Sequence, residues 1–208
     1  MRAVTGSATR LGFFLALGLC VPLWAEQKQA QAEGKTPVEI DFPAAGELRI
    51  NLCPSGTVLK GTDLNKVRVS YEAEHRSDTD HVLVDLRASG NSGTVEVRGC
   101  PHNNFRITVE VPQKTNLYVR MMAGQLEIRG IKGNKDLELH FGQMDVAIGR
   151  ASDYAHAEGS VNSGQVDAPA FNVSKGGLFR SFSMEGPGQY RLRAHVGAGQ
   201  LSITDSED

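Results

Sequence analysis

Polar and apolar residues alternate along most of the chain from Val38 onward. Before residue 112 the alternation is clearest in five segments: 47–52, 66–71, 81–86, 94–97 and 106–111. A period of two indicates half-buried strands, because successive side chains of a strand point to opposite faces. Clusters rich in Gly, Pro, Asn and Ser separate these segments, at 54–56, 89–93 and 101–104. Since no segment of useful length has a helical period, the pattern predicts an all-β protein.

The second half of the chain contains an internal repeat of a glycine, a glutamine and an apolar residue. The four copies begin at Gly124-Gln125, Gly142-Gln143, Gly164-Gln165 and Gly199-Gln200, at intervals of 18, 22 and 35 residues. Alternation resumes after each copy, as in Leu126-Glu127-Ile128. The first half has weaker echoes, at 46–48, 55–58 and 92–95.

A short motif that recurs among strands and tight turns favours a single-domain β-solenoid, or a β-helix-like stack of short strands joined by Gly turns. Each coil would stack on the coil before it. The four glycines would form the corners, where the backbone needs an unusual dihedral or approaches its neighbour closely. We expect the four glutamines to face outward in register and form an amide ladder, with ligand binding as the alternative role: Gln125, Gln143, Gln165 and Gln200.

The longest interval predicts an excursion from the repeat between about residues 171 and 189. It contains Phe171, Phe179, Phe182 and Met184. Aromatic residues near the end of a solenoid are expected to cover its open apolar end. An exposed aromatic surface for a partner is the alternative.

The first 25 residues resemble a signal peptide. Arg2 and Arg10 precede an apolar run over 11–21 that is too short to span a bilayer. We expect cleavage after Ala25, although Leu23 fits the cleavage pattern poorly, and lipidation at Cys20 is the alternative. The remaining domains are expected to be a flexible lead-in at 26–35, the solenoid domain at 36–205 and an acidic tail at 206–208. Within the domain, 36–100 would form less regular opening coils and 104–205 the Gly-Gln coils. No other apolar run is long enough for a transmembrane segment in the mature chain.

The charge is balanced, with 22 Lys and Arg against 24 Asp and Glu, for a formal net charge of −2. Loss of the signal peptide would make the mature chain slightly more acidic. Nucleic-acid-binding proteins usually have a basic surface, so the composition argues against nucleic acid as a partner. The expected site of action is the periplasm, the cell surface or the extracellular space.

Two cysteines remain after the expected cleavage, Cys53 and Cys100, and each precedes a proline. In an oxidising compartment they could pair and join two turns. Two free thiols and a metal site that includes His102 are the alternatives.

Three acidic residues occupy equivalent places in the repeat: Glu127, Asp145 and Asp167. Stacked outward, they are candidates for binding a cation or a sugar, and the fourth equivalent residue is Ser202. A solvated row of side chains is the simpler interpretation. No nucleophile elbow, phosphate loop or histidine metal motif appears, so we expect no catalytic residues, no cofactor and no metal.

The region from 104 to 204 resembles the bacterial putative-adhesin domain, an exported family of unknown function. The resemblance rests on the strand from Phe105 to Pro112 and on the glycine turns that follow it. Residues 46–69 match the family's opening coil less tightly. The resemblance implies a β-solenoid fold and surface attachment, and it implies no catalytic residue.

These features together predict a non-catalytic exported module with a structural, adhesin-like or partner-binding role in the cell envelope. Its partner would be an envelope protein or a glycan. A carbohydrate-binding or carbohydrate-cleaving β-helix protein is the first alternative, and a periplasmic sensor or assembly partner is the second.

Overall fold

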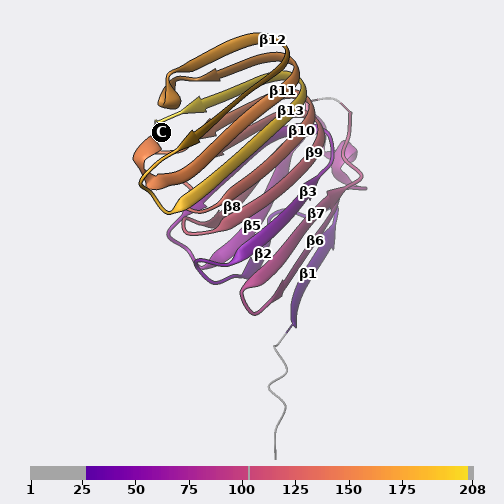
Figure 1. The fold of residues 1–208 in the computed structure, drawn as a ribbon. Helices are drawn as coiled ribbons and strands as arrows, with labels where there is room; N and C mark the ends of the chain where they lie inside the picture. The colour runs from indigo at the N-terminus through magenta and orange to yellow at the C-terminus, as the bar shows by residue number, and fades with distance from the viewer. Residues whose placement is uncertain (1–26, 103, 206–208) are drawn as a thin grey trace, which may run out of the picture.

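The computed structural model describes residues 27–102 and 104–205, which form one open sheet of thirteen strands (Figure 1). The predicted all-β class is confirmed: the described residues contain no α-helix, only three short 3₁₀ turns. None of their helical segments is long and apolar enough to cross a membrane. The expected signal peptide, Cys20 and the acidic tail at 206–208 lie outside the described residues.

In chain order the elements are β1 Gln27–Glu33, β2 Val38–Asp41, β3 Glu47–Leu52, β4 Ser55–Thr62, β5 Lys66–Glu72, η1 Arg76–Thr79, β6 Leu83–Ser89, β7 Ser92–Arg98, β8 Arg106–Pro112, β9 Asn116–Arg129, β10 Lys135–Ala147, η2 Ala151–Asp153, β11 Tyr154–Ala168, η3 Pro169–Phe171, β12 Val173–Glu185 and β13 Tyr190–Thr204.

The long strands β9, β10, β11 and β13 each bend at the repeat glycine, which divides the sheet into two wings. The first half of β9 pairs with β3 and its second half with β4. Thus β3 and β4 together follow the path of one bent strand, with a break at Cys53 and Pro54. β7 and β8 form a second path of this kind. β7 pairs parallel with β3 in the first wing, and β8 pairs parallel with β4 in the second. We call each such path a bent unit, and the shared line of bends the corner.

Six bent units lie parallel and in register. Their order across the sheet is β7/β8, β3/β4, β9, β10, β13 and β11. The expectation that each coil stacks on the one before it is therefore wrong at two places. β3/β4 lies between β7/β8 and β9, and β13 inserts between β10 and β11. The insertion is possible because β10, β11 and β13 present the same pattern of backbone and side chains at their edges.

Antiparallel strands flank the stack at both ends. At one end β6 and β1 extend the first wing, while β5 and β2 extend the second. At the other end β12 pairs antiparallel with β11 along both wings. The expected excursion at about 171–189 is thus mainly β12.

The lead-in at 26–35, which the polar composition predicted to be flexible, forms strand β1 over Gln27–Glu33. All seven of its residues pair with β6. Ala30 and Ala32 pack against the core, and the backbone of β6 supplies the hydrogen-bonding partners of β1. Composition alone does not reveal such a partner strand. The cluster at 54–56, which was expected to separate strands, belongs to β4 from Ser55 onward. The break between β3 and β4 is confined to residues 53–54.

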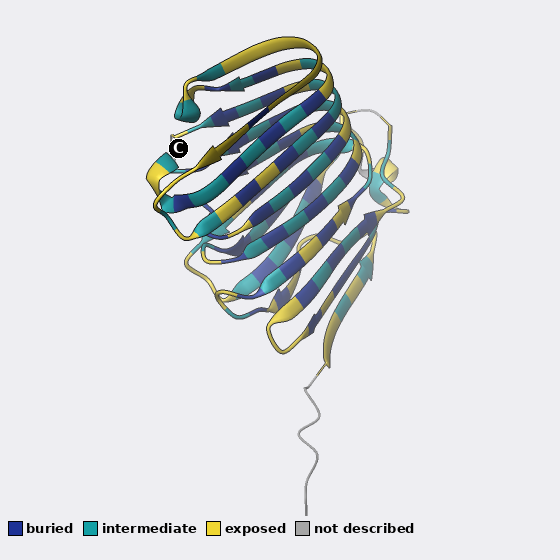
Figure 2. Ribbon diagram, viewed as in Figure 1, coloured by how far each residue is buried: buried dark blue, intermediate teal, exposed yellow. Residues whose placement is uncertain are grey.

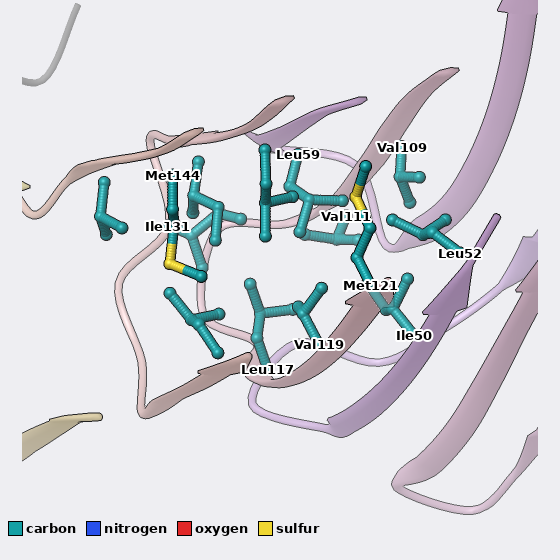
Figure 3. Packing of buried hydrophobic residues seen from close by; sticks show 14 of the residues in the cluster. Ile50, Leu52, Leu59, Val109, Val111, Leu117, Val119, Met121, Ile131 and Met144 are labelled. Carbon is teal, nitrogen blue, oxygen red and sulfur yellow. The ribbon is translucent and has the colours of Figure 1, made fainter. Parts of the chain in front are cut away.

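The core fills the space between the two wings, where side chains such as Leu117 and Val119 of the first wing face Leu59 and Val111 of the second (Figure 3). Buried residues alternate mainly with partly buried ones along the bent strands (Figure 2). The phase of this alternation changes at the corner. In β9 the buried residues are 117, 119 and 121 before the bend, and 126 and 128 after it. The shift keeps apolar side chains inside on both wings.

The corner brings backbones into direct contact. Each repeat glycine has a positive φ, from +125° at Gly124 to +144° at Gly199, which side-chain-bearing residues rarely adopt. A Cβ atom at Gly142 would overlap the carbonyl oxygen of Gly124, and one at Gly199 would overlap that of Gly142. Gly164 has the same relation to Gly199. We call these four residues the glycine column.

Replacing Gly142 with alanine should destabilise the protein strongly. The positive φ alone costs an L-residue about 1–3 kcal/mol, and the Gly124 carbonyl must also move. We expect the free energy of unfolding to fall by about 2–4 kcal/mol, measured by urea denaturation.

Gly90 provides the matched control for this change. It too has a positive φ, of +56°, but a Cβ atom there would meet nothing within 4 Å. Gly90→Ala should therefore cost only about 1 kcal/mol. Equal losses in the two variants would contradict the close-approach explanation.

Candidate functional site

The outer surface of the corner is an apolar strip beside a row of glutamines. Ala123, Phe141, Ala198 and Ser163 align on neighbouring strands immediately before the glycine column. Phe141 is 58% exposed and Met122, one residue earlier than Ala123 on β9, is 55% exposed. We call Met122, Ala123, Phe141 and Ala198 the outer strip. Large exposed apolar side chains that gather along one line are typical of an interaction surface.

The four repeat glutamines follow the outer strip on the other side of the glycine column. In register they run Gln125, Gln143, Gln200 and Gln165, so the order across strands differs from the order along the chain. Gln143 is half-buried and the other three are exposed. The Gln143 amide donates a hydrogen bond to Asp145 Oδ2 at 2.9 Å. That amide therefore binds along its own strand instead of extending a ladder between strands.

The acidic candidates lie on the outer face of the second wing, two residues beyond the glutamines. Glu127 and Asp145 are neighbours in register, but Ser202 separates Asp145 from Asp167. Glu127 also forms an ion pair with Arg129, with 3.1 Å between Oε1 and Nη1. Burial raises the pKa of Asp145, the hydrogen bond from Gln143 opposes that rise, and the charge of Glu127 adds to it. The structure thus brings two of the three acids together.

The outer face of the first wing has a different chemistry, based on ion pairs between strands. Arg120 binds Asp136 at 3.2 Å and Glu138 at 3.0 Å. Ser160 Oγ and His195 Nδ1 lie 2.9 Å apart on neighbouring strands. These side chains are still partly solvent-accessible, so each pair contributes little to stability. Within the described residues, no group of three or more His, Cys, Asp or Glu is arranged to hold a metal ion.

Cys53 and Cys100 form a disulfide at the corner, with Cα atoms 6.1 Å apart. That separation falls within the range that disulfides span. Cys53 lies in the break between β3 and β4, and Cys100 lies in the loop between β7 and β8. The disulfide therefore joins the two bent units, β3/β4 and β7/β8, that are not single continuous strands. A hollow of about 480 Å³ lies on one side of it, lined by Ser55, His102, Arg106 and Gln125 among others.

A buried lysine that sequence reasoning missed lies at the start of β10, on the side of the core that is away from the corner. Lys135 is 2% exposed and occupies a core-facing position between Leu117 and Leu192 on the adjacent strands. Its Nζ donates to the Gly133 carbonyl at 3.1 Å and lies 2.6 Å from the Tyr154 hydroxyl. Burial lowers the pKa of Lys135 from 10.5 to about 7 and raises the pKa of Tyr154 above its usual range. The sequence does contain one clue: Lys135 lies two residues before Leu137 and four before Leu139, so the alternation places it on the buried face of the strand.

Comparisons with known proteins bear on the fold. No protein-family model matches the chain, and no curated protein matches it. The crystal structure of a protein from Clostridium sporogenes, named a putative cell adhesion protein, is similar to it. The two chains are 14% identical, the TM-score is 0.50, and the match covers 81% of this chain and 98% of the other. At this identity the likeness concerns the fold alone.

The disulfide predicts that unfolded, unreduced protein has almost no free thiol from Cys53 and Cys100. The measurement is a thiol titration in denaturant on purified protein that was folded under oxidising conditions, repeated after reduction, which should release two thiols per chain. Two reactive thiols before reduction would contradict the pairing.

Lys135 predicts a pH-dependent stability. A lysine whose folded pKa is lowered binds fewer protons when folded than when unfolded, so stability should rise as the pH increases from about 7 towards 10. The full contribution of this pKa shift to the free energy of unfolding is at most about 5 kcal/mol. Lys135→Met should flatten the rise, measured by urea denaturation between pH 7.5 and 9.5, and should stabilise the protein near pH 7.

The exposed Lys60 provides the control for this measurement. Lys60→Met should leave the slope of stability against pH unchanged. A wild-type slope that persists in Lys135→Met would show that another group is responsible.

Proposed function

We propose that the chain is an exported, non-catalytic binding module of the cell envelope with an adhesin-like role, and that the outer strip is its contact surface. The observation that favours this role is the exposure of Phe141 and Met122 at the corner, next to a row of glutamine amides. Aromatic residues and methionine are enriched at protein interfaces, and adjacent amides can orient a partner through hydrogen bonds. The adhesion name of the Clostridium sporogenes protein agrees with this role.

In this proposal the six bent units are the coils of a short β-solenoid. The return segments between them, such as 130–134 between β9 and β10, bring the chain back from the second wing to the first. A rigid stack of this kind repeats each outward position at the spacing between strands, about 4.8 Å. The outer strip would therefore suit an extended partner, either an envelope protein or a glycan, that lies along the corner. Export would follow from the signal peptide expected at 1–25.

Carbohydrate binding or cleavage is the second candidate, and the pair Glu127 and Asp145 favours it. Two neighbouring carboxyl groups, one of them with a raised pKa, are the groups that sugar-binding and sugar-cleaving sites use. In this case the second wing, and not the outer strip, would be the contact surface.

The proposed surface predicts that Phe141→Ser combined with Met122→Ser weakens binding to an isolated envelope fraction at least about tenfold, since both exposed apolar anchors are lost. The measurement is a titration of purified, labelled protein onto immobilised envelope. Leu64→Ser is the matched control, because Leu64 is 53% exposed but lies outside the strip, between β4 and β5. It should bind like the wild type.

A glycan array and a reducing-sugar release assay separate the two candidates. Sugar turnover that disappears in Asp145→Asn would overturn the non-catalytic proposal in favour of the second candidate. Wild-type binding by the Phe141 and Met122 double variant would show that the outer strip is not the contact surface.

A further inference from the structure

The last strand of the stack, β12, has one free edge. It pairs with β11 and with no other described strand. Most of its residues are exposed, whereas on both sides of its corner β11 alternates between buried and partly buried positions (Figure 2). Leu178 is 64% exposed, Phe179 80% and Met184 42%. An edge strand with several exposed apolar residues can accept another strand.

The opposite end of the stack is protected in the ways that natural edge strands usually are. β1 has mostly exposed polar side chains, and its Lys28 forms an ion pair of 3.3 Å with Asp41 of β2. β2 has only four residues, and its Glu39 binds Lys66 and Arg68. Strand addition is therefore expected at β12 and not at β1 or β2.

The pairing of β12 with β11 shows which β12 residues belong to the core rows, because residues directly opposite in a sheet lie on the same face. Each of the following β12 residues lies opposite a buried residue of β11: Val173, Lys175, Arg180, Phe182 and Met184. Before the corner these positions are odd-numbered, and after it they are even-numbered. The corner of β12 is the segment 177–180, which lies opposite Val161 to Gly164.

We propose that β12 is the interface of a homodimer, in which two copies pair antiparallel about a two-fold axis through the corner. Two constraints determine the register. Core-facing residues of one copy must meet core-facing residues of the other, and the two corners must coincide. A single register satisfies both, with the axis between Leu178 and Phe179.

This register is self-complementary, as a two-fold interface requires. Leu178 lies opposite Phe179 of the second copy and Val173 opposite its Met184, and each pair occurs twice. Thus the three exposed apolar side chains of β12 all gain apolar partners. The core rows continue from one copy into the next, and the paired backbones satisfy the free edge.

The charges on β12 are compatible with this pairing. Lys175 lies opposite Phe182 of the second copy, where its aliphatic stem and ammonium can contact the ring. Its Nζ already donates to the Ser181 carbonyl at 2.9 Å, and Arg180 Nε donates to the Gly176 carbonyl at 3.0 Å. No like charges lie directly opposite each other in this register. On the outer face Ser174 lies opposite Ser183 of the second copy.

The first test is the oligomeric state of the exported protein, measured by sedimentation velocity over a range of concentrations. We expect a closed dimer. Leu178→Thr combined with Phe179→Asn should raise the dimer dissociation constant at least about tenfold. Asparagine suits position 179 because it tolerates the positive φ of +50° found there. An unchanged circular dichroism spectrum would show that the variant still folds.

Phe141→Thr is the matched control, because Phe141 is similarly exposed but lies on β10. It should remain a dimer even if it loses partner binding, so failure of the dimer and failure of the proposed function are distinguishable. A monomer at all concentrations, open-ended growth, or a dimer that survives the double variant would each overturn the proposal.

The second test concerns the register. Ser174→Cys and Ser183→Cys proteins, each with one added thiol, are mixed under mild oxidation. Directly opposite residues in an antiparallel pair have Cα atoms about 4.5–5.5 Å apart, within disulfide range. Disulfide-linked chains should therefore form in the mixture and far less in either protein alone. Equal crosslinking in the separate proteins would exclude this register.

Discussion

At the corner, glycine backbones of neighbouring strands lie against one another with no room for a side chain between them, and the other features of the molecule depend on this contact. A carbonyl oxygen of one strand occupies the space that a Cβ atom would need on the next. Because the approach recurs from Gly124 to Gly142, Gly199 and Gly164, all four strands bend at the same level. Two wings and an enclosed core follow from that shared bend.

The corner also determines which side chains meet. It shifts the alternation by one position, so apolar residues face inward on both wings and polar residues outward. Outward residues therefore form continuous rows across strands. The Glu127 and Asp145 pair, the ion pairs of the first wing and the glutamine row are consequences of this registration. Apolar residues just before the column, such as Phe141, remain outside because the bend leaves them on the convex surface.

Where the repeat cannot continue, the structure uses other means. The disulfide joins the units that lack a continuous bent strand. Lys135 occupies a core position at the start of β10, where its ammonium contacts a carbonyl and a tyrosine hydroxyl. β12 ends the stack with cationic side chains bound to its own backbone and with apolar residues in solvent. These departures from the repeat are where we place the pH dependence of stability and self-association, while the regular corner is where we place partner binding.

Local pattern alone determined the strand class, the positions of β3, β5 and β8, and the identity of the corner glycines, because alternation and glycine tolerance are properties of short segments. Only the tertiary structure decided the insertion of β13 between β10 and β11, since β10, β11 and β13 offer nearly equivalent edges and long-range pairing chooses among them. It also decided that the polar segment 27–33 is a strand, because β6 supplies its hydrogen bonds. The burial of Lys135 was also decided by the tertiary structure. A buried ammonium needs polar partners, and one of them, the Tyr154 hydroxyl, comes from another strand.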